Sequence, residues 1–330
     1  MMRDFERKLI TEWRRLQLPM TDATVIIAIS GGADSISLLL ATDELRKLGK
    51  LDLRLVAAHF NHGLRRAESD EDEEFVRQIC SERNIEFALG RAGSKHISDV
   101  EQSARNDRYD FLRSTAKNLR ASFVCTAHTR NDQAETFLLN LIRGSGVDGL
   151  AGMAAARSLN GSDTSIHLVR PLLNWAFRGD TEQYCHELDQ KYRSDTMNED
   201  GSFTRVRIRQ ILLPLLKDFN PKIIDRLADT AGLLRDEIGP KTDEFQETLS
   251  ISDLSDLSEP EVRRAVRSWL AGHRGTLKQL GLKHIDAVCR LVNSRKSGKT
   301  VELPGGDRVV KEGGKLAFIK NNVEKRPAGA

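Results

Sequence analysis

The residues of this 330-residue chain with the clearest potential for chemistry form the run Ser30-Gly31-Gly32-Ala33-Asp34-Ser35. Paired glycines let the backbone turn tightly and present bare N–H groups, and the serines add hydroxyl donors. At the start of a helix such donors would hold a phosphate or a pyrophosphate. Asp34 would repel a bare phosphate, so its carboxylate indicates Mg²⁺ held against phosphate oxygens. The alternative is a glycine-rich turn that binds nothing, and the strand and helix patterns on either side argue against it.

Side chains that could bind a triphosphate occur further along the chain. Arg105 and Arg108 are three residues apart in a predicted helix, so their guanidinium groups share a face. Two arginines on one face suit a triphosphate, although surface ion pairs are the alternative. His59 follows a predicted strand beside the glycine run and could donate a hydrogen bond to ATP or to a base.

Two carboxylates and a histidine follow another predicted strand, at residues 122–127. Asp132 and Glu135 are three residues apart at the start of a helix and share a face. This strand would end at the same edge of the sheet as the glycine run. We therefore expect Asp132 to reach the metal and Glu135 to receive an ammonium group, while His128 could donate to a phosphate.

These candidates need a scaffold that brings distant turns together, and the first half of the chain predicts one. Strand-like runs alternate with helix-like runs, which implies βαβ units. The predicted fold class is α/β, with a Rossmann-like parallel sheet covered by helices on both faces and a ligand beyond the carboxyl ends of the strands. The strand-like runs are 24–29, 53–59, 85–89 and 122–127, and the helix-like runs are 35–48, 69–83, 100–119 and 132–142.

The second half has a different pattern, and we expect a smaller, mostly helical C-terminal domain. Pro214 and Pro221 interrupt the helical pattern, and a boundary near Leu216 divides the chain into domains 1–216 and 217–330. Pro304-Gly305-Gly306 separates two short strand-like runs and predicts a hairpin. The predicted helices are 205–216, 222–238, 259–270 and 282–292, and the predicted strands are 300–303, 308–310 and 316–319.

Composition excludes several classes of protein. Hydrophobic residues make up 39% and charged residues 30%, which is typical of a globular chain with a core and excludes disordered, collagenous and membrane-spanning chains. The N-terminus has no apolar segment of the kind that directs secretion. The four cysteines are far apart, without a pattern for disulfides, zinc or an iron–sulfur cluster. We expect a cytoplasmic protein with no membrane partner.

Charge is distributed unevenly along the C-terminal third. Residues 217–261 hold 5 Lys/Arg against 12 Asp/Glu, a net charge of −7, whereas residues 262–330 hold 16 against 5, a net charge of +11. A basic segment of this size suggests a nucleic-acid partner, and a solvated surface is the alternative.

Three further patterns do not indicate sites. The acidic run 68–74 is explained by a helix start, where negative charge is favourable, rather than by a metal. The GxGxxG match at 144–149 follows a helix instead of a strand. The Gly298-Lys-Thr300 run lacks the first glycine of a Walker A loop, because position 293 is Asn.

The glycine run resembles the SGGxDS signature of the PP-loop ATP pyrophosphatases. Within that superfamily, further blocks in the family's order resemble the tRNA(Ile)-lysidine synthetases. Val206 is a departure, since the family often has Asn between the two arginines. The blocks are His59-Phe-Asn-His-Gly-Leu-Arg65, Ala104-Arg-Asn-Asp-Arg-Tyr109, His128-Thr-Arg-Asn-Asp-Gln-Ala-Glu-Thr136, Leu141-Ile-Arg-Gly-Ser-Gly146, Arg170-Pro-Leu-Leu173 and Arg205-Val-Arg-Ile-Arg209, and residues 298–306 resemble the second domain.

The resemblance implies a PP-loop ATP pyrophosphatase domain followed by a basic tRNA-binding domain. It implies that ATP adenylates the wobble cytidine of the CAU anticodon of tRNA(Ile), and that free L-lysine then displaces AMP to give lysidine. The oligomeric state stays open, with a homodimer as one alternative. The implied catalytic residues are Asp34, Arg108, Asp132, Glu135, Arg205 and Arg207; those for ATP are Ser30, Gly31, Gly32, Ala33, Asp34, Ser35, His59, Arg105 and His128; and those for Mg²⁺ are Asp34 and Asp132.

Other functions are compatible with parts of this pattern. A tRNA thiolase would need a sulfur carrier or cluster cysteines, which the four isolated cysteines do not provide. Amide-forming relatives act on small acids and need no basic second domain. A non-catalytic RNA-binding protein would not need Asp34, Asp132 and both arginines.

Overall fold

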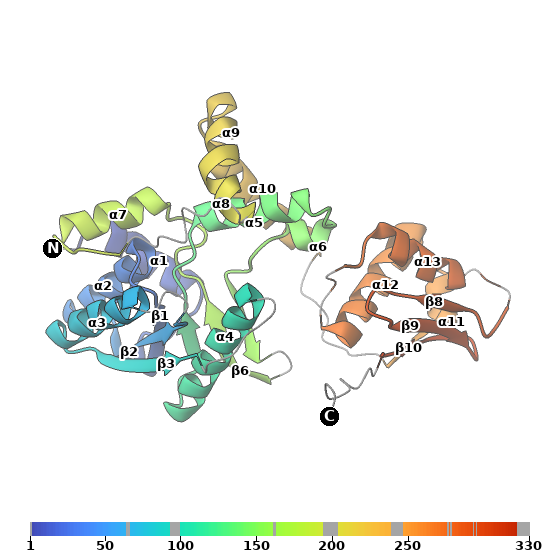
Figure 1. Cartoon of the computed structure of the whole chain (residues 1–330), viewed down its shortest axis with the longest axis horizontal. Helices are drawn as coiled ribbons and strands as arrows, with labels where there is room; N and C mark the ends of the chain where they lie inside the picture. Colours follow the sequence, from blue (N-terminus) through green and yellow to red (C-terminus); the bar gives the residue numbers. More distant parts are fainter. Residues whose placement is uncertain are drawn as a thin grey trace. The chain divides into compact units, whose positions relative to one another are not determined.

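The computed structural model describes residues 2–63, 67–92, 100–160, 163–193, 204–238, 247–275, 277, 279–292, 294 and 296–321. The chain divides into two compact units (Figure 1). The first unit spans residues 1–143 and 148–237, and the second spans 144–147 and 238–330. Among the described helices, none is both long and apolar enough to cross a lipid bilayer.

The first unit is built on a six-stranded sheet with the strand order β3-β2-β1-β4-β6-β5. All neighbouring pairs are parallel except β5 with β6, which is antiparallel. The predicted parallel sheet is therefore confirmed in its main part, and the antiparallel edge strand corrects it. The strands are β1 (Thr21–Ile29), β2 (Asp52–Asn61), β3 (Glu86–Arg91), β4 (Phe123–Cys125), β5 (Ala156–Asn160) and β6 (Asp163–Val169).

Strand β1 is buried on both of its faces, as expected for a central strand of such a sheet. Val25, Ile27 and Ile29 belong to one core cluster, whereas Ile26 and Ala28 belong to another. Helices contribute to both clusters and so cover both faces, as predicted (Figure 1). The helices of the first cluster are α1 (Asp4–Arg15), α2 (Ala33–Lys47), α3 (Ala67–Glu82) and α7 (Arg178–Glu187), and that of the second is α4 (Val100–Asn118).

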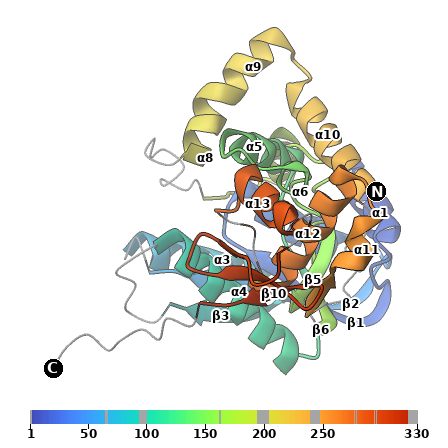
Figure 2. The same cartoon turned by 90° about the vertical axis from the view of Figure 1, so that its right-hand side faces the viewer.

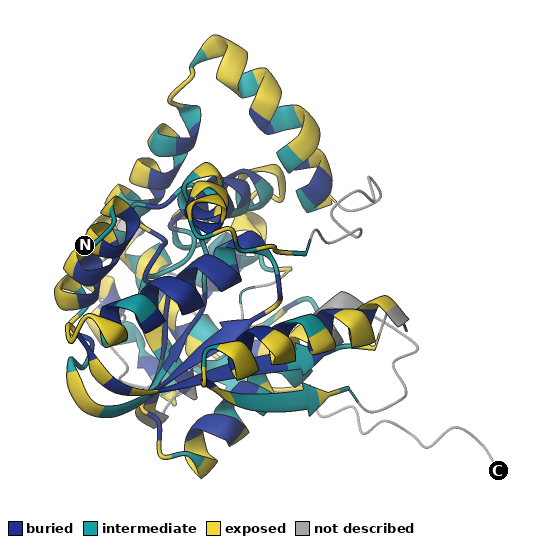
Figure 3. Ribbon diagram, turned by 90° about the vertical axis from the view of Figure 1, so that its left-hand side faces the viewer, coloured by how far each residue is buried: buried dark blue, intermediate teal, exposed yellow. Residues whose placement is uncertain are grey.

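A helical subdomain completes the first unit. Its own small core joins Ala134 and Leu138 to Ile208, Leu213 and Ile224. The end of this subdomain, at the top of Figure 3, is largely exposed. Its elements are α5 (Arg130–Ile142), α6 (Val147–Leu150), α8 (Thr204–Arg207), the π-helical turn η2 (Ile208–Leu212), α9 (Leu213–Phe219) and α10 (Ile223–Ile238).

The packing of the helical subdomain determines where the first unit ends. The first compact unit continues to Glu237, beyond the predicted boundary at Leu216, because Leu213 and Ile224 pack against α5. The assignment of residues 1–216 to adenylation and 217–330 to tRNA binding stays a prediction.

The second unit corrects the expectation of a mostly helical domain. It contains a four-stranded antiparallel sheet with the order β7-β10-β9-β8, next to α12 and α13 (Figure 2). The predicted hairpin and third strand are confirmed as β8, β9 and β10, whereas the three-residue β7 was too short for the sequence to indicate. The elements are β7 (Thr248–Ser250), α11 (Ile251–Ser255), α12 (Glu259–Arg274), α13 (Leu282–Val292), β8 (Thr300–Glu302), β9 (Arg308–Glu312) and β10 (Lys315–Ile319).

Candidate active site

The glycine run forms the predicted turn from β1 into α2. Gly31 has a φ of 94°, a conformation that a residue with a side chain rarely adopts. Ser35 Oγ accepts a hydrogen bond from the Ser30 N–H at 3.1 Å and donates to the Gly32 carbonyl at 3.0 Å. Because Ala33 and Asp34 begin α2, their N–H groups are free of partners within the helix and can bind an anion.

Asp34 lies in the first turn of α2, close to a carboxylate from another element. The hydroxyl of the fully buried Thr181, in α7, lies 2.5 Å from Asp34 Oδ1 and can donate to it. Burial, followed by repulsion from the Asp132 carboxylate, raises the pKa of Asp34 to about 6. The predicted convergence of Asp34 and Asp132 is therefore confirmed, because β1 and β4 are neighbours in the sheet.

Asp132 has two roles at the start of α5. Its Oδ2 accepts hydrogen bonds from the N–H and the hydroxyl of Thr129, at 2.8 and 3.1 Å, and so caps the helix. Its Oδ1 lies 3.5 Å from Arg205 Nη2 and 3.8 Å from Arg178 Nη2. One carboxylate therefore orders the helix start and faces two guanidinium groups.

Glu135 is fully buried and is surrounded by three arginines from distant elements. Arg205 Nε donates to Glu135 Oε2 at 2.9 Å, and Arg209 donates through Nε at 2.7 Å and through Nη2 at 3.0 Å. Arg178 Nη2 is 3.5 Å from Glu135 Oε1. The shared face predicted for Asp132 and Glu135 is confirmed, since each of these arginines lies within 4.0 Å of both carboxylates.

Of the two arginines predicted in this segment, Arg205 contacts Glu135 and Arg207 does not. Arg207 is exposed on α8, and no contact with Glu135 is present for it. Arg209, one helical turn after Arg205, lies beside Glu135, and Arg178 joins it from α7. The four-residue spacing of Arg205 and Arg209 is a signal that the sequence contains, whereas nothing local points to Arg178.

The two histidines predicted to bind ATP are His59, near the end of strand β2, and His128, which follows strand β4. His59 Nδ1 donates to the Ile29 carbonyl at 3.0 Å, and burial lowers the pKa of His59. Its neutral form therefore keeps Nε2 as an acceptor, which corrects the expectation of a donor. His128 follows β4, and burial together with the charges of Arg170 and Arg108 holds its pKa well below the usual value.

The predicted arginine pair, Arg105 and Arg108, lies on α4. The charges of both arginines contribute to the lowered pKa of His128. Desolvation, with a smaller contribution from Arg105, lowers the pKa of Arg108. Arg170, directly after β6, is almost fully buried and also acts on His128, although its sequence context alone indicates no such role.

The acidic run on α3 is paired with arginines, in keeping with its interpretation as a helix start. Burial opposes ionisation of Glu73, but hydrogen bonds from Arg91, Asn61 and Arg77 outweigh it and lower its pKa to about 2. Arg193 pairs with Asp72 at 2.9 Å and also with Glu71. Over the described parts of the chain, no group of three or more metal-binding side chains is found.

The four cysteines lie in the described part of the chain, and none of them forms a disulfide. Burial raises the pKa of Cys80, Cys125 and Cys185 to about 12, so these thiols are poor nucleophiles. Cys289, in the second unit, is partly buried.

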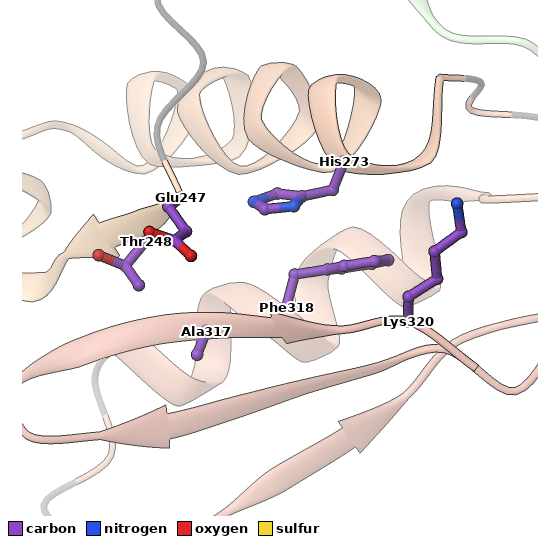
Figure 4. A pocket seen from close by; sticks show the side chains of 6 residues that line it. All are labelled: Glu247, Thr248, His273, Ala317, Phe318 and Lys320. Atoms are coloured by element: carbon purple, nitrogen blue, oxygen red, sulfur yellow. The ribbon is translucent and has the colours of Figure 1, made fainter. Parts of the chain in front are cut away.

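A hollow of about 360 Å³ lies in the second unit, between α12 and the edge of its sheet (Figure 4). The rings of His273 and Phe318 stack inside it with centroids 4.9 Å apart. None of the residues predicted for chemistry lines it. Its lining residues are Glu247, Thr248, His273, Ala317, Phe318 and Lys320.

Two family models match this chain. The family model described as PP-loop domain matches residues 5–216, and the TilS substrate binding domain matches residues 249–317. A solved U34-tRNA thiolase, NcsA from Methanococcus maripaludis with its [4Fe-4S] cluster, superposes with a TM-score of 0.58 at 17% identity. That superposition covers 70% of this chain and 78% of the thiolase, and at this identity it supports the fold alone.

Three curated relatives carry the name tRNA(Ile)-lysidine synthase. The protein from Porphyromonas gingivalis is 39% identical over 78% of this chain and 53% of its own length, and that from Geobacter sulfurreducens 35% identical over 90% and 65%. The protein from Geobacillus kaustophilus is 31% identical over 92% of this chain and 68% of its own length. The chain thus spans about half to two thirds of the length of these relatives. With both family models matched in order, the chain belongs to the PP-loop family and, within it, to the tRNA(Ile)-lysidine synthase family.

Proposed function

We propose that this chain is an ATP-dependent ligase that joins free L-lysine to C2 of the wobble cytidine in the CAU anticodon of tRNA(Ile). The observation that carries the proposal is the meeting of Asp34 and Asp132 beside the glycine turn, next to the arginines that surround Glu135. We interpret the chemistry of these residues from the two family models that match the chain, the PP-loop domain and the TilS substrate binding domain.

ATP is proposed to bind at the turn from β1 to α2. The N–H groups of Gly31 to Ser35 and the Ser30 hydroxyl would bind the phosphates, with Arg105, Arg108 and His128 adding donors. Because His59 keeps Nε2 as an acceptor, it suits an N–H or O–H group of the adenosine.

Asp34 and Asp132 are the residues that would hold Mg²⁺. The fit is supported by the repulsion between the two carboxylates, which a dication would relieve. Two protein carboxylates plus phosphate oxygens match the usual coordination of Mg²⁺ in nucleotide sites. When bound, Mg²⁺ would neutralise charge on the phosphates.

The proposed reaction has two steps. The C2 carbonyl oxygen of cytidine attacks the α-phosphorus of ATP, and the bond to pyrophosphate breaks. The neutral ε-amine of lysine then attacks C2, the C–O bond to AMP breaks, and the attacking nitrogen releases a proton. Adenylation is needed because an amide-like oxygen is otherwise a poor leaving group.

Glu135 is proposed to hold the lysine ammonium and to accept a proton from it. Its carboxylate already binds three arginines, so the ammonium would displace one of them. Arg178 is the natural choice, since its 3.5 Å contact is the longest of the three. Arg205 and Arg209 would remain, and the exposed Arg207 would face the RNA.

The test is to incubate the protein with ATP, labelled lysine and tRNA(Ile) bearing CAU, and to determine the mass of the modified nucleoside. We expect lysine in the nucleoside and release of pyrophosphate that requires the tRNA, with a tRNA bearing a different wobble base as control. A sulfur-containing nucleoside would identify a thiolase instead. Binding of tRNA without pyrophosphate release would leave a non-catalytic RNA-binding protein.

A further inference from the structure

Four arginines gather around one phenol in the first unit. Arg105 Cζ lies 5.6 Å and Arg157 Cζ 5.4 Å from the centre of the Tyr109 ring. Burial opposes ionisation of Tyr109, yet the charges of Arg105, Arg170, Arg108 and Arg157 outweigh it and lower the pKa of the phenol. So many cations around one side chain create a strongly positive region.

The described part of the chain offers these charges no acidic partner. Among the described residues, none of the four arginines forms an ion pair with a carboxylate. Arg113 is a useful contrast, because it lies on the same helix as Tyr109 and pairs with Asp110 at 2.5 Å. The positive region around Tyr109 is therefore suited to an anion supplied from outside.

Arg170 is the unusual member of the group. It is 3% exposed, and its Nε has no hydrogen-bond partner, while Nη1 donates to the Ala154 carbonyl at 2.7 Å. Burial lowers its pKa to about 10, with the charges of Arg157 and Arg105 acting in the same direction. Keeping a guanidinium in such surroundings is costly, which indicates that its charge has a use.

Two members of the group, Arg157 and Arg170, lie away from the glycine turn. Arg170 follows β6, and Arg157 lies in β5 opposite Leu168 of β6, so both are at the carboxyl edge of the sheet. In the strand order, β6 is two strands and β5 three strands from β1. At the usual spacing of neighbouring strands, that is about 10 to 14 Å from the strand that carries the turn.

We propose that the exposed Arg157, supported by Tyr109 and the buried Arg170, binds a phosphodiester of the RNA strand next to the nucleoside that reacts. This inference rests on the proposed function and adds a second phosphate site to it. Arg105 and Arg108 remain with ATP. A planar guanidinium can bind two phosphate oxygens at once, and an exposed position lets a continuous strand reach it.

The test compares Arg157→Gln with Arg113→Gln, which removes the same charge from an arginine that already has an acidic partner. Affinity for tRNA(Ile) is measured by filter binding at several salt concentrations. We expect Arg157→Gln to bind tRNA severalfold more weakly. The slope of the logarithm of its binding constant against the logarithm of the salt concentration should become shallower by about 0.7 to 0.9, the value for one lost phosphate contact. Arg113→Gln should keep the wild-type slope. Tyr109→Phe should weaken binding in the same direction, and circular dichroism checks that each variant is folded.

Separate measurements identify the anion. Equilibrium dialysis with ATP alone and the dependence of product formation on lysine concentration should be unchanged in Arg157→Gln. A fall in ATP affinity would place Arg157 in the nucleotide site, and a rise in the lysine requirement would assign it to the lysine carboxylate; either result overturns the proposal, as does an unchanged salt slope. If the wild type makes no lysidine but the slopes still differ as expected, the proposed function fails and the phosphate site stands.

Discussion

The carboxylate of Asp34 lies among groups that change its proton affinity in opposite directions. Burial and Asp132 disfavour the charged form, whereas the Thr181 hydrogen bond and Arg178 favour it. The ionised form of Asp34 is therefore unfavourable in the protein without ligands, and bound ligands can stabilise it.

Asp34→Ala should abolish adenylation without unfolding the protein, because Asp34 lies in the first turn of α2 and is not a member of the apolar core. Losing metal-assisted charge neutralisation should slow pyrophosphate release by on the order of a thousandfold. The measurement is tRNA-dependent pyrophosphate release, with circular dichroism as the control for folding. Near-normal release would remove Asp34 from the metal site.

Asp34→Asn should stabilise the protein at pH 8. In the folded protein the pKa of Asp34 is raised from 3.8 to about 6. The contribution of this carboxyl group to stability is therefore fully present below about pH 4 and is lost as the pH rises through 6. Removing the charge should therefore increase the free energy of unfolding at pH 8 by up to about 3 kcal/mol. Urea titrations at pH 5 and pH 8 test this, and a gain as large at pH 5 as at pH 8 would contradict the electrostatic explanation.

Thr181→Val keeps the shape of the side chain but removes the hydroxyl 2.5 Å from Asp34. If that hydroxyl orients the carboxylate, kcat for pyrophosphate release should fall about tenfold, which corresponds to about 1.4 kcal/mol. Thr181→Ser should restore most of the rate. A Thr181→Val enzyme with the wild-type kcat would show that Asp34 needs no such support.

At the scale of elements, Glu135 connects three separate segments. It joins α5 to α7 through Arg178, to α8 through Arg205 and to the π-helical turn through Arg209. π-helical turns are often found at functional sites, and this one places Arg209 beside Arg205 at the same carboxylate. The cluster therefore organises the helical subdomain as well as the proposed lysine site.

Glu135→Gln tests both roles of this cluster. Removing the charge leaves three guanidinium groups without their common anion, so we expect a loss of about 3 kcal/mol in the free energy of unfolding. Adenylated tRNA should still form, and its capture by lysine should slow. If ATP binding and adenylation fail in a variant that is folded, Glu135 belongs to the nucleotide site instead.

At the scale of the whole molecule, net charge differs between parts of the chain. Residues 262–330 carry 16 Lys/Arg and 5 Asp/Glu, a net charge of +11, whereas residues 217–261 carry a net charge of −7. The structure distinguishes among the basic side chains of α12, since Arg263 Nε pairs with Asp286 at 2.7 Å and Arg264 is exposed. Arg264 is therefore the clearer probe of RNA binding by the second unit.

Arg264→Glu should weaken tRNA binding and reduce its log–log salt slope by about one unit, because one RNA phosphate would no longer be neutralised by the protein. ATP affinity should be unchanged, because the proposed nucleotide site lies in the first unit. Filter binding at several salt concentrations measures both the affinity for tRNA and its salt slope. An unaltered slope would favour a basic surface that only keeps the protein in solution.

The sequence by itself determined the features that depend on neighbouring residues. The buried strand, the Gly31-Gly32 turn and the helix after it were predictable because backbone conformation and apolar periodicity are local properties. The same holds for the shared face of Asp132 and Glu135, which follows from helix geometry. The antiparallel β5 and the three-residue β7 carry no such local signal, so only the tertiary structure revealed them.

Tertiary structure alone decided which distant side chains meet. Thr181 reaches Asp34 across 147 residues and Arg209 reaches Glu135 across 74, and no pattern in either segment specifies its partner. Buried charges require partners, but the sequence does not say which ones, since that depends on how the sheet brings the turns together. For the same reason Arg205 and Arg209 pair with Glu135 while Arg207, only two residues away from each, points to solvent on another face of the helix.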